Sequence, residues 1–89
     1  MIVLPYYERV YKDDRLLKRA KLVYLYLADR QKDGVAWPSL DVMARDLSMS
    51  RKTVKRAVAD LERFGYIRKE LFFREEDGKQ TSNRYFILK

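Results

Sequence analysis

Two short amphipathic segments that lie almost end to end constrain the fold of this chain most strongly. Each begins just after a serine, Ser39 or Ser50, at the position that a helix N-cap prefers. Their apolar residues recur at helical spacing, so we predict helices over about 40–47 and 51–64. Because so little chain separates these helices, they must turn sharply and pack against each other.

A longer helix is predicted upstream of this pair and a hairpin downstream of it. Gly65 stands where a C-cap glycine belongs, and strand-like sequence on either side of a polar turn predicts strands over about 66–73 and 81–88. Over about 14–31, apolar residues recur along one helical stripe, which indicates a core-facing side. The stripe consists of Leu16, Ala20, Val23, Tyr24, Leu27 and Ala28.

The register of the hairpin depends on its turn. A two-residue turn at 77–78 would place charged residues opposite apolar ones. A loop over 76–78 instead pairs Ile67 with Ile87, and it keeps apolar residues together. We prefer this second register, because a slip of one residue exchanges the two faces of a strand.

The remaining segments carry weaker signals. Residues 1–13 are predicted to form an extended arm or short strand on a domain that spans 14–89, and 35–37 can form a very short strand. Trp37 is expected in the core rather than as a stacking platform for bases. The predicted first helix is apolar on a second side, which either the arm or another subunit covers. That side carries Leu22, Leu25 and Tyr26.

The order of these elements resembles that of the winged helix-turn-helix, an α+β fold with three helices and a C-terminal two-stranded wing. Ala44 stands where the first helix of that motif needs a small residue. The stretch "VKRAVADLERFGYIRK" resembles the end of the recognition helix in GntR-like bacterial regulators. The stretches "KLVYLYLADR", "WPSL", "SRKTVKRA" and "TSNRY" resemble, in this order, the N-terminal winged helix of plasmid and phage replication initiators. The resemblance covers roughly 20–88.

Two departures from that family pattern affect the expected geometry. The turn of the motif often contains glycine where this chain has Ser48, so the turn must form with a β-carbon present. Glu75, Glu76 and Asp77 form an acidic cluster at the expected wing tip, where they would face phosphates. Deep insertion of the wing tip into a minor groove is therefore not expected.

The charge and the missing residue types narrow the function. The net charge is +7, so polyanions are the natural partners, nucleic acid before an anionic membrane. The chain contains no cysteine and no histidine, which removes disulfides, thiol nucleophiles and imidazole catalysis. We expect a non-catalytic cytoplasmic protein with no metal, no cofactor and no membrane partner.

Cations crowd the start of the helix predicted over 51–64, where the positive end of the macrodipole disfavours them. A phosphate backbone opposite them would reverse that preference, because each neutralised phosphate releases a counterion. Arginines are the favoured readers of guanine, serines at helix N-termini suit phosphate, and basic residues on the wing could touch the DNA backbone. The predicted DNA-binding residues are Arg51, Lys52, Thr53, Lys55, Arg56, Ser50, Ser39, Arg74, Lys79 and Arg84.

The leading interpretation is sequence-specific binding of double-stranded DNA, with the third helix of the fold in the major groove. The role would be transcription regulation or replication initiation, and the motifs favour a plasmid or other mobile element. A homodimer would form through the arm and the first helix. An adaptor that binds proteins is the alternative, and binding of single-stranded nucleic acid is a weaker one. The chain also fits the N-terminal domain of a larger protein.

Overall fold

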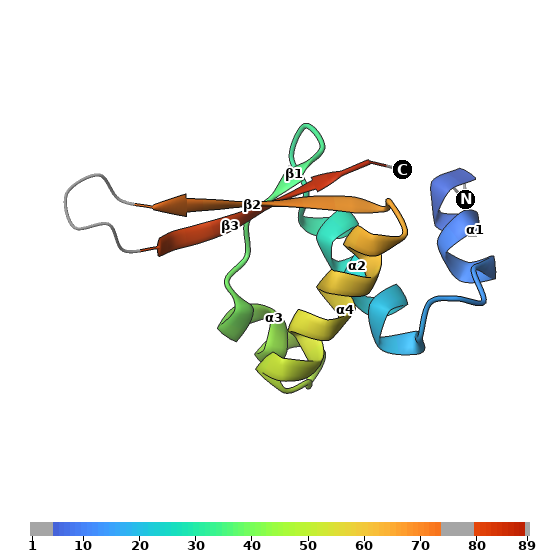
Figure 1. Ribbon diagram of the computed structural model, residues 1–89, viewed down its shortest axis with the longest axis horizontal. Coiled ribbons are helices and arrows are strands. Elements are labelled where there is room, and N and C mark those ends of the chain that lie inside the picture. The colour runs from blue at the N-terminus through green and yellow to red at the C-terminus, as the bar shows by residue number, and fades with distance from the viewer. Residues whose placement is uncertain (1–4, 74–79, 89) are drawn as a thin grey trace.

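The computed structural model describes residues 5–73 and 80–88 of the chain. Its elements follow in the order α1 (Pro5–Lys12), α2 (Lys18–Arg30), β1 (Val35–Ala36), α3 (Leu40–Leu47), α4 (Arg51–Arg63), β2 (Ile67–Phe73) and β3 (Gln80–Ile87). The strands form an antiparallel sheet with the order β1-β3-β2. This arrangement confirms the predicted α+β winged helix-turn-helix. The β2–β3 hairpin, which is the wing, projects past the helices on the side away from α1 (Figure 1).

Serine caps fix where α3 and α4 begin. The Ser39 hydroxyl accepts a hydrogen bond from the backbone N–H of Val42 at 3.1 Å, and the Ser50 hydroxyl accepts one from Thr53 at 3.1 Å. Each bond satisfies one of the N–H groups that a helix start leaves without an intrahelical partner. Both predicted caps are confirmed, and α3 has its predicted bounds.

The turn between α3 and α4 contains a serine in the left-handed conformation. Ser48 has φ 54° and ψ 44°, so the turn forms with a β-carbon present, as predicted. The N–H of Met49 donates to the carbonyl of Ala44 at 2.9 Å, which closes the end of α3. A left-handed residue here redirects the chain within one step, and α4 then crosses α3 closely.

The end of α4 also has a residue in the left-handed conformation, and here that residue is a glycine. Gly65 has φ 78°, and the N–H of Tyr66 donates to the carbonyl of Leu61 at 2.9 Å. This is the Schellman pattern, in which glycine avoids the steric cost of positive φ. It confirms the predicted C-cap and sends the chain directly into the wing.

The core lies between α2, α3, α4 and the base of the sheet. The stripe predicted for the first long helix is buried from Leu16, just before α2, to Ala28, and α4 contributes Val54, Ala57, Val58 and Leu61 to the same core. Tyr24 and Tyr66 meet edge to face, with ring centroids 5.7 Å apart. Ala44 is also buried, which fits its expected role as the small residue at the helix crossing.

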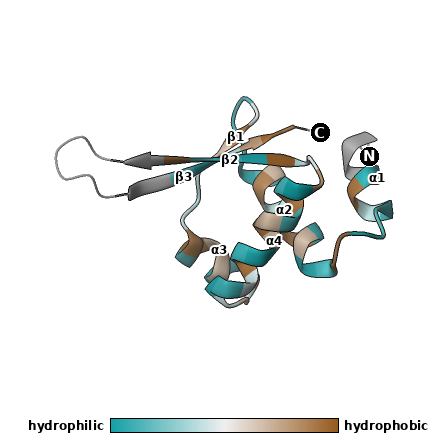
Figure 2. Ribbon diagram, viewed as in Figure 1, coloured by the Kyte–Doolittle hydropathy of each residue, from teal (hydrophilic) through white to brown (hydrophobic). Residues whose placement is uncertain are grey.

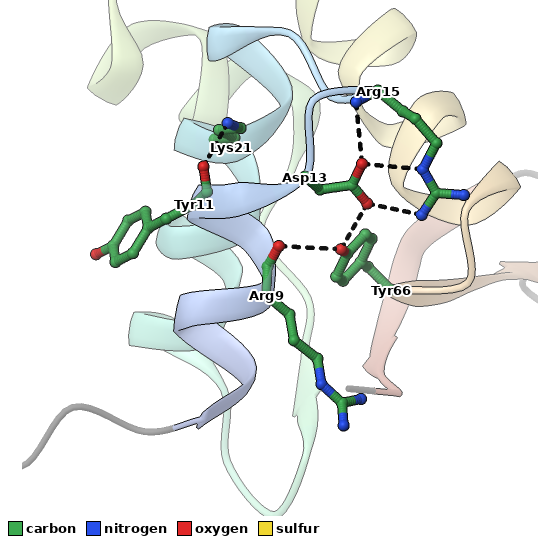
Figure 3. A network of polar contacts seen from close by, with 6 residues as sticks. All are labelled: Arg9, Tyr11, Asp13, Arg15, Lys21 and Tyr66. Atoms are coloured by element: carbon green, nitrogen blue, oxygen red, sulfur yellow. Dashed lines mark hydrogen bonds and ion pairs between the residues drawn. The ribbon is translucent and has the colours of Figure 1, made fainter.

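The prediction of an extended N-terminal arm was wrong, because residues 5–12 form helix α1. Val10 of α1 is fully buried, so this helix belongs to the core. The Nζ of Lys21 on α2 donates to the carbonyl of Tyr11 at 2.7 Å (Figure 3). The N-terminal segment therefore packs on α2, as expected, but it does so as a helix.

The first long helix begins later than the predicted start at residue 14. Asp13 accepts hydrogen bonds from the backbone N–H and the guanidinium of Arg15, which hold this segment in a turn (Figure 3). Side chains that bond their neighbours in this way compete with helical hydrogen bonds. As a result, α2 starts at Lys18.

The prediction that Trp37 lies in the core was also wrong. Its side chain is 55% exposed, whereas its neighbour Ala36 is 1% exposed. Successive side chains of a strand point to opposite faces, and in this short strand Ala36 takes the buried side. Leu22 of α2 is 48% exposed, so the second apolar side of α2 is not fully covered.

The preferred register of the wing is confirmed. Ile67 pairs with Ile87, and the pairing continues in step to Phe72 opposite Ser82 before a β-bulge. The loop predicted over 76–78, with the acidic cluster, lies outside the described residues.

Candidate nucleic-acid interface

The outer side of α4 carries the basic residues that the sequence analysis predicted for DNA binding. Arg51, Lys52, Lys55 and Arg56 are all exposed, while the opposite side of the helix is buried. Figure 2 shows the same division as alternating hydrophilic and hydrophobic colours around the turns of α4. Because positions four apart lie on one side of a helix, the cations form two parallel rows.

The first row, Arg51 and Lys55, borders a groove between α4 and the wing. This groove has a volume of about 580 Å³. Its lining residues come from the segment leading into α3, from α3 and α4, and from both wing strands. They are Pro38, Ser39, Leu40, Asp41, Arg51, Lys55, Val58, Lys69, Leu71, Asn83 and Tyr85. The second row, Lys52 and Arg56, does not line the groove and faces solvent beside it.

The wing side of the groove follows from the strand register. Lys69 lies opposite Tyr85 and Leu71 lies opposite Asn83, so all four share one face of the hairpin. Tyr85 is fully buried, and burial raises the pKa of its hydroxyl above the ordinary value. It accepts a hydrogen bond from the Asn83 amide at 3.2 Å. The groove thus has a neutral, polar floor with a cation on each side.

The predicted serines and threonine sit at the helix starts. Ser39 lines the groove, and its hydroxyl oxygen already accepts the α3 cap bond, which leaves its proton available for an anion. Ser50 and Thr53 share a hydrogen bond of 2.8 Å between their hydroxyls. One of the two hydroxyl protons is used in that bond, so the pair can offer the other one to a phosphate oxygen.

The predicted wing residues do not all reach this surface. Arg84 is exposed and lies opposite Glu70, on the hairpin face that alternates with the groove face. The groove lining therefore excludes it. Arg74 and Lys79 lie outside the described residues.

Sequence reasoning missed Lys69 and Asp41, which both line the groove. The signal for Lys69 was present, because the preferred register places it on the same strand face as buried Ile67. Asp41 follows the Ser39 cap by two residues and resembles an ordinary first-turn acid. Its Oδ1 atom lies 3.1 Å from Nε of Arg51, a contact between two helices that no local pattern reveals.

Comparison with known proteins agrees with this geometry. A family model described as a helix-turn-helix domain matches residues 15–67. The chain belongs to this helix-turn-helix family. The matched segment runs from the turn before α2 to the first residue of the wing, so it includes α3, α4 and the Ser48 turn. Membership indicates DNA binding as the general function of the chain.

No curated protein matches this helix-turn-helix chain. Among the described residues, no helix is both long enough and apolar enough to cross a membrane.

Proposed function

We propose that this domain binds double-stranded DNA sequence-specifically, with the N-terminal half of α4 in the major groove. The observation that carries the proposal is the exposure of four cations on the first half of α4, opposite its buried stripe. These cations disfavour the free helix by about 0.3–1 kcal/mol each through the macrodipole. Several phosphate contacts together change affinity by orders of magnitude over ordinary salt concentrations, so binding outweighs that cost.

In this proposal the arginines and the lysines of α4 have different roles. Arginines reach base edges with paired donors, so Arg51 and Arg56 are the candidates for reading sequence. Lysines act as point charges, which suits Lys52 and Lys55 for phosphate. Ser39 and the Ser50–Thr53 pair add hydroxyl donors to the backbone at the two helix starts. The domain acts by binding, and no catalytic role is proposed.

The test is a salt titration of binding to a mixed-sequence duplex by fluorescence anisotropy. We expect the affinity of the wild type to fall steeply as salt rises. Lys52→Ala/Lys55→Ala should lose affinity, and its log–log salt slope should shrink by about one for each phosphate that is no longer neutralised. The matched control is Lys18→Ala/Lys32→Ala, which removes the same charge from exposed positions that do not line the groove. A wild type that binds no duplex at low salt would refute the proposal.

The biological role that we propose is transcription regulation or replication initiation. The order of "WPSL", "SRKTVKRA" and "TSNRY" favours replication of a plasmid or other mobile element. Selection of binding sites followed by mapping of the selected sequence separates the two roles, because origins carry repeated copies and operators overlap promoters. Sites found singly at promoters would contradict the replication role.

A second candidate is assembly of two copies through α1 and α2. Tyr11 is 52% exposed, Leu17 51% and Leu22 48%, and the Lys21–Tyr11 bond holds the two helices side by side. Burial of these side chains in a two-fold contact would suit a palindromic DNA site. Sedimentation velocity should then show dimers that Leu22→Glu converts to monomers. A monomer at high concentration, with a protein partner captured in place of DNA, would favour the adaptor alternative.

A further inference from the structure

Arg51 forms an ion pair with the acidic residue Asp41, although a surface that only binds phosphate would not need an acid there. Arg51 opens α4 and Asp41 lies in the first turn of α3, so the two residues come from the two helices of the motif. Nε of Arg51 lies 3.1 Å from Oδ1 of Asp41, and both residues line the groove. The side chains are 62% and 76% exposed, which places the pair where DNA could reach it.

The atom that Asp41 engages determines which donors Arg51 has left. A guanidinium carries five N–H groups in a planar fork, and the Nε–H belongs to its side edge. Because the Nε side of the guanidinium lies against the Asp41 carboxylate in this ion pair, the edge formed by the two terminal nitrogens remains for a base. Guanine presents O6 and N7 side by side in the major groove, and two terminal N–H groups match that spacing. The pair therefore favours end-on contact with guanine.

The negative charge of Asp41 also favours contact between Arg51 and a base rather than a phosphate. A phosphate bound by Arg51 would lie close to the Asp41 carboxylate, and like charges repel over that distance. A base edge carries no net charge and avoids that penalty. The other groove cations, Lys55 and Lys69, form no ion pair within the described part of the chain and remain suited to phosphate. The carboxylate thus gives Arg51 a different role from that of the lysines, which bind the DNA backbone.

Stability alone gives little reason for this pair. Exposed ion pairs contribute little to folding because solvent screens them and both side chains lose rotamer freedom. Fixing a long arginine before binding does, however, lower the entropy lost when the complex forms.

We infer that Asp41 is a positioning residue that sets base specificity by holding Arg51 end-on for one guanine of the bound site. This inference rests on the proposed function, since it concerns the same DNA-binding surface. Asp41 itself need not touch the DNA. Its effect is a preference for one base rather than an increase in affinity.

The test is selection from a random duplex library with the full chain, followed by affinity measurements on single-base variants of the selected site. The position read by Arg51 is the one whose base preference disappears in Arg51→Ala. At that position, Asp41→Asn should reduce the preference for guanine about fivefold or more, the lower end of the discrimination that a bidentate arginine–guanine pair provides. Asp41→Asn should also bind random DNA slightly more tightly, because it removes a negative charge.

The control is Asp29→Asn, which makes the same charge change at an exposed position on α2 that does not line the groove. It should bind random DNA slightly more tightly and keep the guanine preference. The double variant Asp41→Asn/Arg51→Ala should have the same base preference as Arg51→Ala, because Asp41 acts on that preference through the arginine. Circular dichroism of each variant checks that the fold is intact.

The inference is overturned if Asp41→Asn keeps the preference and differs from wild type only as Asp29→Asn does. It is overturned as well if Arg51→Ala changes no base preference. In both cases the wild type still binds DNA, so the proposed function stands. Failure of the wild type to bind any duplex overturns both this inference and the proposed function.

Discussion

At the scale of single residues, Asp13 shows how one carboxylate ties together distant parts of the chain. It accepts hydrogen bonds from the backbone N–H, Nε and a terminal nitrogen of Arg15, and from the hydroxyl of Tyr66 at 2.7 Å (Figure 3). Tyr66 also donates to the carbonyl of Arg9 in α1, at 3.3 Å. The network joins the end of α1 to the residue that precedes the wing.

This network makes folding stability depend on pH. The Arg15 guanidinium, and after it the Tyr66 hydroxyl, hold the pKa of Asp13 well below its usual range. A carboxyl whose pKa is lower in the folded state stabilises the protein above its unfolded pKa of about 4, and this contribution is lost as pH falls toward the folded pKa. We therefore expect the free energy of unfolding to decrease below about pH 5.

Asp13→Asn should lower stability at neutral pH and flatten that acid-side slope, because the amide does not titrate. Urea unfolding measured at several pH values between neutrality and about pH 2.5 checks both effects. Asp14→Asn is the matched control, since Asp14 is the neighbouring acid and takes no part in this network. Equal slopes for wild type and Asp13→Asn would show that the network does not shift the titration of Asp13.

At the scale of elements, the turn between α3 and α4 tests how much strain the motif accommodates. Ser48 is exposed and left-handed, so its side chain costs conformational energy and its removal sacrifices little packing. Ser48→Gly should raise the free energy of unfolding by about 0.5–1 kcal/mol, and Ser48→Val should lower it by about 1–2 kcal/mol. Thermal unfolding of the three proteins gives the order. A wild type more stable than Ser48→Gly would contradict this account.

The predictability of the elements depended on whether their signals were local. Ser39, Ser50 and Gly65 marked helix boundaries because capping is decided within a few residues. The start of α2 was misplaced because Asp13 has its partners in Arg15 and in the distant Tyr66. Capping patterns do not reveal such a contact.

The features of the candidate site were likewise predictable only where they depend on local sequence patterns. The rows of cations on α4 followed from helical periodicity, so their exposure could be predicted. Trp37 was misplaced because a strand of two residues gives too little alternation to show which side is buried. The pairing of Asp41 with Arg51 depends on how α3 and α4 cross, which the spacing of apolar residues does not fix.

At the scale of the whole molecule, the groove brings the two wing strands into the proposed interface. Lys69 lies on the groove face of β2, and its neighbour Arg68 lies on the other face, over the ring of Phe86. The wing flank and α4 can therefore meet one DNA strand from two sides. This arrangement does not require the acidic cluster predicted from the sequence to approach phosphates.

These neighbouring cations give a matched pair of variants. Lys69→Ala should weaken binding to all duplexes and reduce the log–log salt slope by about one, because it leaves one phosphate without its cation. Arg68→Ala removes the same charge from the opposite face and should change the slope less. Anisotropy titrations at several salt concentrations measure both. Equal reductions in the two variants would mean that only net charge matters and that the groove is not the contact surface.

The exposed position of Trp37 also gives the molecule a built-in optical reporter. It is the only tryptophan in the chain, so emission excited at the red edge of the absorption band comes from one indole. That indole is already half in water in the native state and shares a shallow hollow with Tyr26, Pro38 and Val42, next to the start of α3. Its emission colour will therefore change little when the protein unfolds. Quenching by iodide or acrylamide will instead report, without any label, whether a bound molecule shields the entrance to α3.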